Sequence, residues 1–215
     1  MNEVTAIQRP RAGRPTREQA EARHAELLDR ALDHFLDKGF EQATIEAIAA
    51  DVGMTKRTVY ARYADKASLF RAAVARAIDH YAIPEDRIRA TDTGDIAQTL
   101  TNIAMLRIDL VASPRGLKLQ RIIQTESYRF PEIFTDSYEL GAMPTIQFLA
   151  DLLERETRLG NLAIDDPIMA ANTFMSMAVA GPVRFILAAS PLPKALLDKR
   201  VAYGVRMFLD GARPR

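Results

Sequence analysis

The sequence predicts an all-α protein with a small N-terminal domain and a larger C-terminal one. Apolar residues recur at helical spacing through almost all of the chain after residue 15, and no segment shows the two-residue alternation of a strand. Helix caps and helix-opening prolines punctuate this pattern. We expect four parts: an arm (1–15), a small helical domain (16–64), a connecting helix (65–83) and a larger helical domain (84–215).

Four helices are expected in the first part of the chain. Each is preceded by a residue whose side chain can accept a hydrogen bond from the first helical turn: Thr16, Thr44, Thr55 and Asp65. Glycines at 39 and 53 stand where the first two helices should end, since glycine adopts the left-handed backbone of a helix stop. The third helix is expected over 56–62, and the fourth extends to about residue 81.

Six helices are expected beyond a polar, turn-rich link over residues 84–94. Their predicted ranges are 95–112, 114–128, 131–140, 144–159, 167–188 and 194–210. Pro114 and Pro167 follow capping residues, which is typical of a helix start. Pro144 is expected to open a helix, and Pro182, inside an apolar stretch, is expected to bend one.

Composition excludes several classes of function. The chain has no Cys and only three His, so neither a thiolate site nor a transition-metal site is expected. No glycine-rich elbow or paired carboxylates accompany the histidines, and we expect no catalytic residues and no cofactor. No apolar run is judged long enough to cross a bilayer, and the N-terminus has no apolar leader, so a cytoplasmic protein without membrane contact is expected.

Positive charge is concentrated in two short blocks. Residues 1–17 hold four Arg against one Glu, and residues 52–76 hold six Lys or Arg against Asp65 alone. Between them, residues 18–51 have a net charge of −6. Two basic blocks around an acidic helix favour two contacts with one polyanion, of which double-stranded DNA is the obvious example.

Residues 44–63 have the pattern of a helix-turn-helix. Apolar residues on one side, Ile48, Ala49, Val52 and Val59, are expected to hold the two helices together. Residues on the other side of the second helix can enter a major groove: Lys56, Arg57, Thr58 and Tyr60. The free N–H groups of the helices that begin at Thr44 and Lys66 suit phosphates.

Residues 16–70 resemble the DNA-binding domain of the tetracycline-repressor (TetR) family. The family pattern is matched by Thr44, Ile48-Ala49, Val52 with Thr55, Thr58-Val59-Tyr60, Arg62-Tyr63, Lys66 and Leu69-Phe70. The resemblance implies phosphate contacts by Tyr60, Arg62 and Lys66 and base reading by 56–60. Arg57 and Arg62 depart from the Gly and His that many members have there. Tyr63 is expected to pack rather than to contact DNA.

The arm and residues 125–134 extend this resemblance. In the arm, the Gly-Arg-Pro centre formed by residues 13–15 is like that of arms that enter A·T-rich minor grooves, although a tail without a role is equally consistent. Arg14 of this centre and Arg11 before it are the expected contacts. The segment TESYRFPEIF resembles a signature in one branch of the family's regulatory domains. The expected DNA-binding set is Thr44, Thr55, Lys56, Arg57, Thr58, Tyr60, Arg62, Lys66, Arg11 and Arg14.

The same resemblance implies a ligand cavity and a dimer in the C-terminal domain. The candidates for the cavity are Met105, Phe148, Phe174, Met177 and Arg121, although core packing is the plainer explanation for most apolar members. The candidates for the interface are two stripes on the last two long helices: Phe174, Ala178, Gly181, Phe185, Val201, Val205 and Phe208. A two-fold homodimer would present two recognition helices to a palindromic operator.

The sequence therefore favours a sequence-specific transcriptional regulator, most simply a repressor released from DNA by a small, largely apolar inducer. Two other classes stay open at this point. One is a helical module that binds a ligand or a protein but not DNA. The other is a small-molecule enzyme built on the C-terminal domain, for which no residue pattern speaks.

Overall fold

The computed structural model describes residues 16–214, and these residues form helices and their connections without a strand, which confirms the all-α prediction. By its internal contacts the chain divides into two compact units, residues 1–70 and 71–215. The division falls within helix α4, Lys66–Tyr81. Leu69 and Phe70 belong to the first unit because both are fully buried there.

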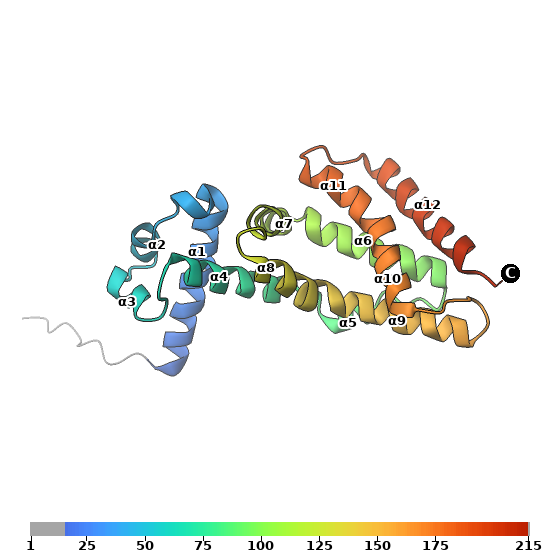
Figure 1. Ribbon diagram of the computed structural model, residues 1–215, viewed down its shortest axis with the longest axis horizontal. Coiled ribbons are helices and arrows are strands. Elements are labelled where there is room, and N and C mark those ends of the chain that lie inside the picture. Colours follow the sequence, from blue (N-terminus) through green and yellow to red (C-terminus); the bar gives the residue numbers. More distant parts are fainter. Residues whose placement is uncertain (1–15, 215) are drawn as a thin grey trace, which may run out of the picture. The chain divides into compact units, whose positions relative to one another are not determined.

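The first unit is built from three helices and the start of α4 (Figure 1). These are α1, Arg17–Gln42; α2, Ile45–Asp51; and α3, Lys56–Tyr60. Thr16 and Gln19 form the expected capping box, and Gly39 leaves the helical backbone at φ 76°. The core contains three aromatic rings, with Phe70 lying 4.9 Å from Phe35 and 5.1 Å from Phe40 between centroids. This cluster fixes the helices on which α2 and α3 dock.

The second unit is a helical bundle. After α4 come α5, Glu85–Arg89; α6, Ile96–Ala112; α7, Pro114–Glu126; α8, Pro131–Asp136; η1, Ser137–Ala142; α9, Met143–Arg158; α10, Pro167–Met175; η2, Ser176–Ala180; α11, Gly181–Leu187; and α12, Lys194–Ala212. In Figure 1, α6 lies beside α11 and α12, and α9 packs against α10. Apolar residues of these helices form one core around Ile103, Leu149 and Phe174.

Two features of the second unit differ from the expectation. The link over 84–94 contains a short helix, α5, whose Arg89 pairs with Glu85 at 2.6 Å. Pro144 lies in the first turn of α9, as expected for a helix start, but no break precedes it, because helical structure continues from Pro131 through η1 to Arg158. The wider π turn η1 directly precedes the proline and relieves the clash that its ring makes in an α-helix. η2 stands in the same position before Pro182.

One apolar helical run was underestimated from the sequence. Pro167–Leu187 is 21 residues long, has a mean hydropathy of 1.2, and by length and composition alone could cross a bilayer. The expectation that no such run exists is therefore wrong. Only 28% of its apolar window is buried within the described chain, so much of this run faces outward. A helix that contributes to a bundle core and also to an interface has the same composition.

Candidate nucleic-acid interface and ligand cavities

The helix α3 is short, and Val59 is the side chain that packs it into the first unit. The Thr55 side chain accepts a hydrogen bond from the Thr58 backbone N–H at 3.1 Å, and the two threonine hydroxyls lie 2.8 Å apart. Val59 is fully buried, whereas Lys56, Arg57, Thr58 and Tyr60 are exposed. The amphipathic pattern read from the sequence is therefore present in the fold. In α2, Thr44 caps the helix by accepting from the Ala47 N–H at 3.3 Å.

Lys56 is held by an ion pair across the two helices. Its ammonium group contacts the carboxylate of Glu46 on α2 and lies 5.5 Å from the centre of the Tyr60 ring. The hydrogen bond from Lys56 lowers the pKa of the Glu46 carboxyl, and Glu46 raises the pKa of the Lys56 ammonium group. Both side chains are more than half exposed, so the pair orients Lys56 rather than burying it.

Arg57 and Arg62 are basic residues of this surface whose charge is not paired with a carboxylate among the described residues. Both are exposed, and neither forms an ion pair with any residue within the described range 16–214. A guanidinium with free donors can contact a guanine edge or a phosphate through two parallel hydrogen bonds. On and just after α3, these two residues are therefore available to a nucleic acid.

Lys66 is placed differently from the other basic residues. Its ammonium group donates to the backbone carbonyl of Glu41 at 3.0 Å and lies 4.6 Å from the centre of the Phe40 ring. Lys66 is half-buried and ties the start of α4 to the end of α1. This residue therefore has a structural role besides any contact with DNA.

Tyr63 packs against α1. Its hydroxyl lies 2.5 Å from Nε2 of His24, with the two rings stacked at 6.0 Å between centroids. Burial raises the pKa of the Tyr63 phenol. The half-buried position agrees with a packing residue. Arg11 and Arg14 of the arm lie outside the described residues.

The five ligand candidates do not gather around one cavity. Phe148 lines a groove of about 690 Å³, Arg121 lines a cavity of about 320 Å³, and Met177 lines a groove of about 510 Å³. Phe174 is fully buried in the core, against Phe208. Met105 packs on the edge of that core. Periodicity placed these residues on helices but gave no information on which faces converge.

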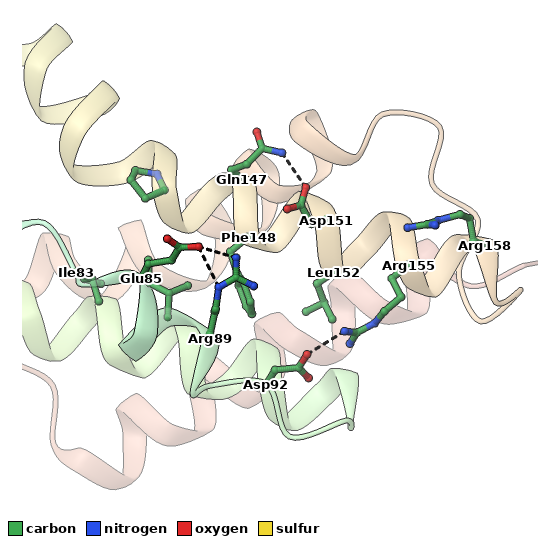
Figure 2. Close-up of a pocket in the computed structure, with 12 residues that line it drawn as sticks. Ile83, Glu85, Arg89, Asp92, Gln147, Phe148, Asp151, Leu152, Arg155 and Arg158 are labelled. Carbon is green, nitrogen blue, oxygen red and sulfur yellow. Dashed lines mark hydrogen bonds and ion pairs between the residues drawn. The ribbon is translucent and has the colours of Figure 1, made fainter.

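The groove of 690 Å³ lies between α5 and α9 (Figure 2). Its floor is apolar, with Ile88, Phe148 and Leu152. Its charged rim is largely paired: Asp92 meets Arg155 at 3.0 Å, and this hydrogen bond lowers the pKa of the Asp92 carboxyl. Figure 2 also shows Glu85 with Arg89, on the side of the groove that α5 provides. These contacts attach α5 to α9 and leave few free polar groups for a ligand.

A fourth cavity, of about 40 Å³, contains a residue that sequence reasoning missed. It lies among α4, α6, α7 and η1 and is lined by apolar residues together with Arg107 and the uncharged polar residues Tyr81, Gln120 and Ser137. Nη1 of Arg107 donates to the carbonyl of Gly141 at 2.8 Å, and burial lowers the pKa of its guanidinium. Its position on an otherwise apolar helix face, next to Ala104, Ile108 and Val111, was the available signal.

The residues of the two predicted interface stripes differ in burial. Phe174, Ala178, Val201 and Val205 are buried within the chain, so they offer little surface to a partner in this structure. Gly181, Phe185 and Phe208 are half-buried. The reason is that the small residues serve an intramolecular contact: a Cβ on Gly204 of α12 would lie 3.5 Å from Ala178 of η2. The outward apolar residues of these helices are Met177, Leu196, Tyr203 and Met207.

The helix-turn-helix with its basic face, joined to a helical bundle, defines the class of DNA-binding transcriptional regulators. Residues 27–73 match the family model of the bacterial regulatory proteins of the tetR family. Residues 98–211, about half of the chain, match the C-terminal domain of AefR-like transcriptional repressors. The chain therefore belongs to the TetR family, as its sequence pattern predicted.

Individual proteins agree with this assignment. A crystal structure of a TetR-family regulator from Mesorhizobium loti is 24% identical, covers 93% of this chain and all of its own, and superposes with a TM-score of 0.75. The flavonoid-responsive regulator FrrA is 27% identical, covers 91% and 99% of the two chains, and gives 0.72. The uncharacterized regulator YdeS of Bacillus subtilis is 28% identical over 112 residues, which is about half of each chain.

Proposed function

We propose that the protein is a cytoplasmic, homodimeric repressor that binds a palindromic operator and leaves it when a small, largely apolar ligand binds the second unit. The observation that supports this most directly is α3, which exposes Lys56, Arg57, Thr58 and Tyr60 while Val59 anchors it. Arg57 and Thr58 are proposed to read bases. Tyr60, Arg62 and Lys66, with the helix starts at Thr44 and Thr55, are proposed to contact phosphates.

A dimer is supported by an exposed apolar surface on the last helices, which we call the α12 face. It consists of Met177, Leu196, Tyr203 and Met207, whose exposed fractions are 42%, 41%, 56% and 48%. Together they line the groove of about 510 Å³, whose bottom is formed by Gly181 and Gly204. Apolar patches that are exposed in one chain mark contact surfaces. A second copy of the chain is the partner that we propose for the α12 face, because TetR-family regulators act as dimers.

Release by a ligand is supported by the family and by the relatives. TetR-family regulators bind small molecules, and one structural relative is named for its response to flavonoids. Helix α4 is one continuous helix that belongs to both units, so a shift of its second half can reach the DNA-binding unit. A tenfold loss of operator affinity requires a coupling free energy of about 1.4 kcal/mol.

A selection for bound DNA tests this proposal. Purified protein is mixed with random double-stranded fragments, and the retained fragments are sequenced over several rounds. We expect an inverted repeat to be enriched, with half-sites about one helical turn apart. In the selection with the Arg57→Ala variant, the enriched site should show a weaker base preference at one position of each half-site. Enrichment of a single, non-repeated half-site would contradict the dimer, and no enrichment would contradict sequence-specific binding.

A further inference from the structure

Arg107 is half-buried and presents its guanidinium to a cavity without a counter-charge. The cavity walls come from four elements and include apolar residues such as Ile78 of α4, Leu110 of α6 and Leu119 of α7. Three polar but uncharged side chains, Tyr81, Gln120 and Ser137, also line it. Within residues 16–214, no carboxylate lies within ion-pair distance of Arg107, and its one hydrogen bond goes to the neutral carbonyl of Gly141. A guanidinium has five N–H donors, so most of its donors have no protein acceptor.

A charge in this position is costly unless an anion joins it. Burial disfavours an ion that has no partner, and this cost is usually met by a paired charge. A neutral N–H donor in the same place would satisfy the Gly141 carbonyl without a charge to bury. The charge itself is therefore the feature that the Gly141 contact does not explain, and it indicates an anionic group that enters the cavity.

The contact with Gly141 lies where the hydrogen bonding of the helix is irregular. Gly141 is in the π turn η1, and π turns are frequent at functional sites. One helical turn later, the hydroxyl of Thr145 is buried and has no hydrogen-bond partner among the described residues. A threonine hydroxyl in a helix commonly donates to the carbonyl four residues earlier, which here is Gly141.

We propose that the effector is a carboxylate with a small apolar body, which binds the guanidinium of Arg107 in the cavity among α4, α6, α7 and η1. This inference rests on the proposed function and specifies its ligand. The cavity of about 40 Å³ is too small for an organic acid as it stands, so binding must move its walls. Ile78 and Tyr81 of α4 are among these walls. Displacement of the second half of α4 is the route from the ligand to the operator.

The test compares carboxylates with their neutral amides on full-length protein. Thermal unfolding is followed by circular dichroism with benzoate or hexanoate, and separately with benzamide or hexanamide, at matched ionic strength. We expect at least one carboxylate to raise the midpoint temperature and its amide to leave it unchanged. In Arg107→Gln, which removes the charge and shortens the side chain, the half-saturating carboxylate concentration should rise at least tenfold. Arg115→Gln, an exposed arginine on α7, serves as the matched control.

Four outcomes would overturn the proposal, and the first three concern the carboxylates and Arg107. The first is an equal shift with the amides, the second is an equal response of Arg107→Gln, and the third is no shift of the wild type with either carboxylate. A response that is lost in Arg121→Gln but kept in Arg107→Gln would also overturn it, because it would place the ligand in the 320 Å³ cavity.

Operator binding is measured separately, so that the two proposals fail independently. Anisotropy of labelled operator DNA, without and with the carboxylate, should show release from the wild type and retention by Arg107→Gln. Retained DNA binding without a carboxylate effect would contradict only the ligand class. Absence of DNA binding by the ligand-free protein would contradict the proposed function, while the unfolding experiment would still report on the cavity.

Discussion

The ammonium group of Lys56 on α3 is paired with the carboxylate of Glu46 on α2. The proposed base-reading helix therefore shares an ion pair with the helix that precedes it. Both side chains are exposed, and each shifts the pKa of the other toward its charged form. A phosphate that approaches this surface meets Lys56 already oriented and Glu46 as a competing negative charge.

Glu46→Gln should strengthen binding to DNA. The substitution removes a negative charge from the proposed interface and releases Lys56 for a phosphate, so affinity should rise severalfold and the salt dependence should become steeper by up to about one counter-ion. Anisotropy titrations at several salt concentrations measure both quantities. Glu26→Gln, an exposed change on α1, is the control. Weaker binding by Glu46→Gln would mean that orienting Lys56 matters more than freeing it.

Arg57→Ala should lower affinity for the operator by about 1–3 kcal/mol if Arg57 reads a base. The guanidinium is exposed and has no ion pair among residues 16–214, so its loss should not disturb the fold. Operator and shuffled DNA are compared by anisotropy at one salt concentration. An equal loss on both would show that Arg57 contacts a phosphate instead.

Lys66→Ala should weaken binding to all DNA alike and flatten the salt dependence, and it should also destabilise the protein. The expected loss in the free energy of unfolding is about 1 kcal/mol, because Lys66 donates to the Glu41 carbonyl and lies over the Phe40 ring. Urea unfolding measures the second effect, with Lys38→Ala as an exposed control. If Lys66→Ala changes neither the free energy of unfolding nor the salt dependence of DNA binding, Lys66 neither stabilises the fold nor contacts a phosphate.

The architecture of the first unit was predictable because local signals decide it. Thr16, Thr44 and Thr55 cap the helices that the sequence assigned to them, and Gly39 and Gly53 have positive φ as their positions required. The second unit was harder, because a proline is an ambiguous signal. Pro144 was expected to open a helix and lies in the first turn of α9, but the π turn η1 joins this helix to α8 without the break that the sequence suggested.

Tyr63→Phe should destabilise the protein by about 1 kcal/mol at neutral pH, because it removes the hydrogen bond with His24. Burial raises the pKa of Tyr63 in the fold, so the fold favours the neutral phenol. This contribution is complete below the unfolded pKa of about 10 and is lost as pH rises through the folded value. The stability difference between wild type and variant should therefore shrink above pH 10. Tyr128→Phe, at a fully exposed tyrosine, should show no difference at any pH.

Tyr203→Glu and Met207→Glu should convert the dimer to a monomer. Each places a charge on the α12 face, where both native side chains are about half exposed in the single chain. We expect the dissociation constant of the dimer to rise at least tenfold, which is about 1.4 kcal/mol. Sedimentation equilibrium measures it, and Tyr128→Glu is the control for a charge elsewhere on the second unit. Dimers of unchanged strength would exclude this face.

The sequence pattern did not show which helix faces of the second unit point to the core and which point outward. Phe174 and Val201 have the spacing of an interface, but in the fold they meet the core, and Tyr203 and Met207 point outward instead. Periodicity identifies a stripe without stating what it packs against. Arg107 was missed for a related reason: its importance comes from its neighbours Ile78, Leu119 and Gly141, which are far from it in the chain.

The most direct test of the central claim is fluorescence anisotropy of the purified protein on DNA from upstream of its own gene, compared with shuffled DNA, at two salt concentrations. We predict tighter binding to the native fragment and strong weakening of both complexes at the higher salt concentration. Where the regulator controls a distant gene, fragments recovered by the selection replace the upstream DNA. Equal affinity for the recovered and the shuffled DNA would contradict a sequence-specific regulator.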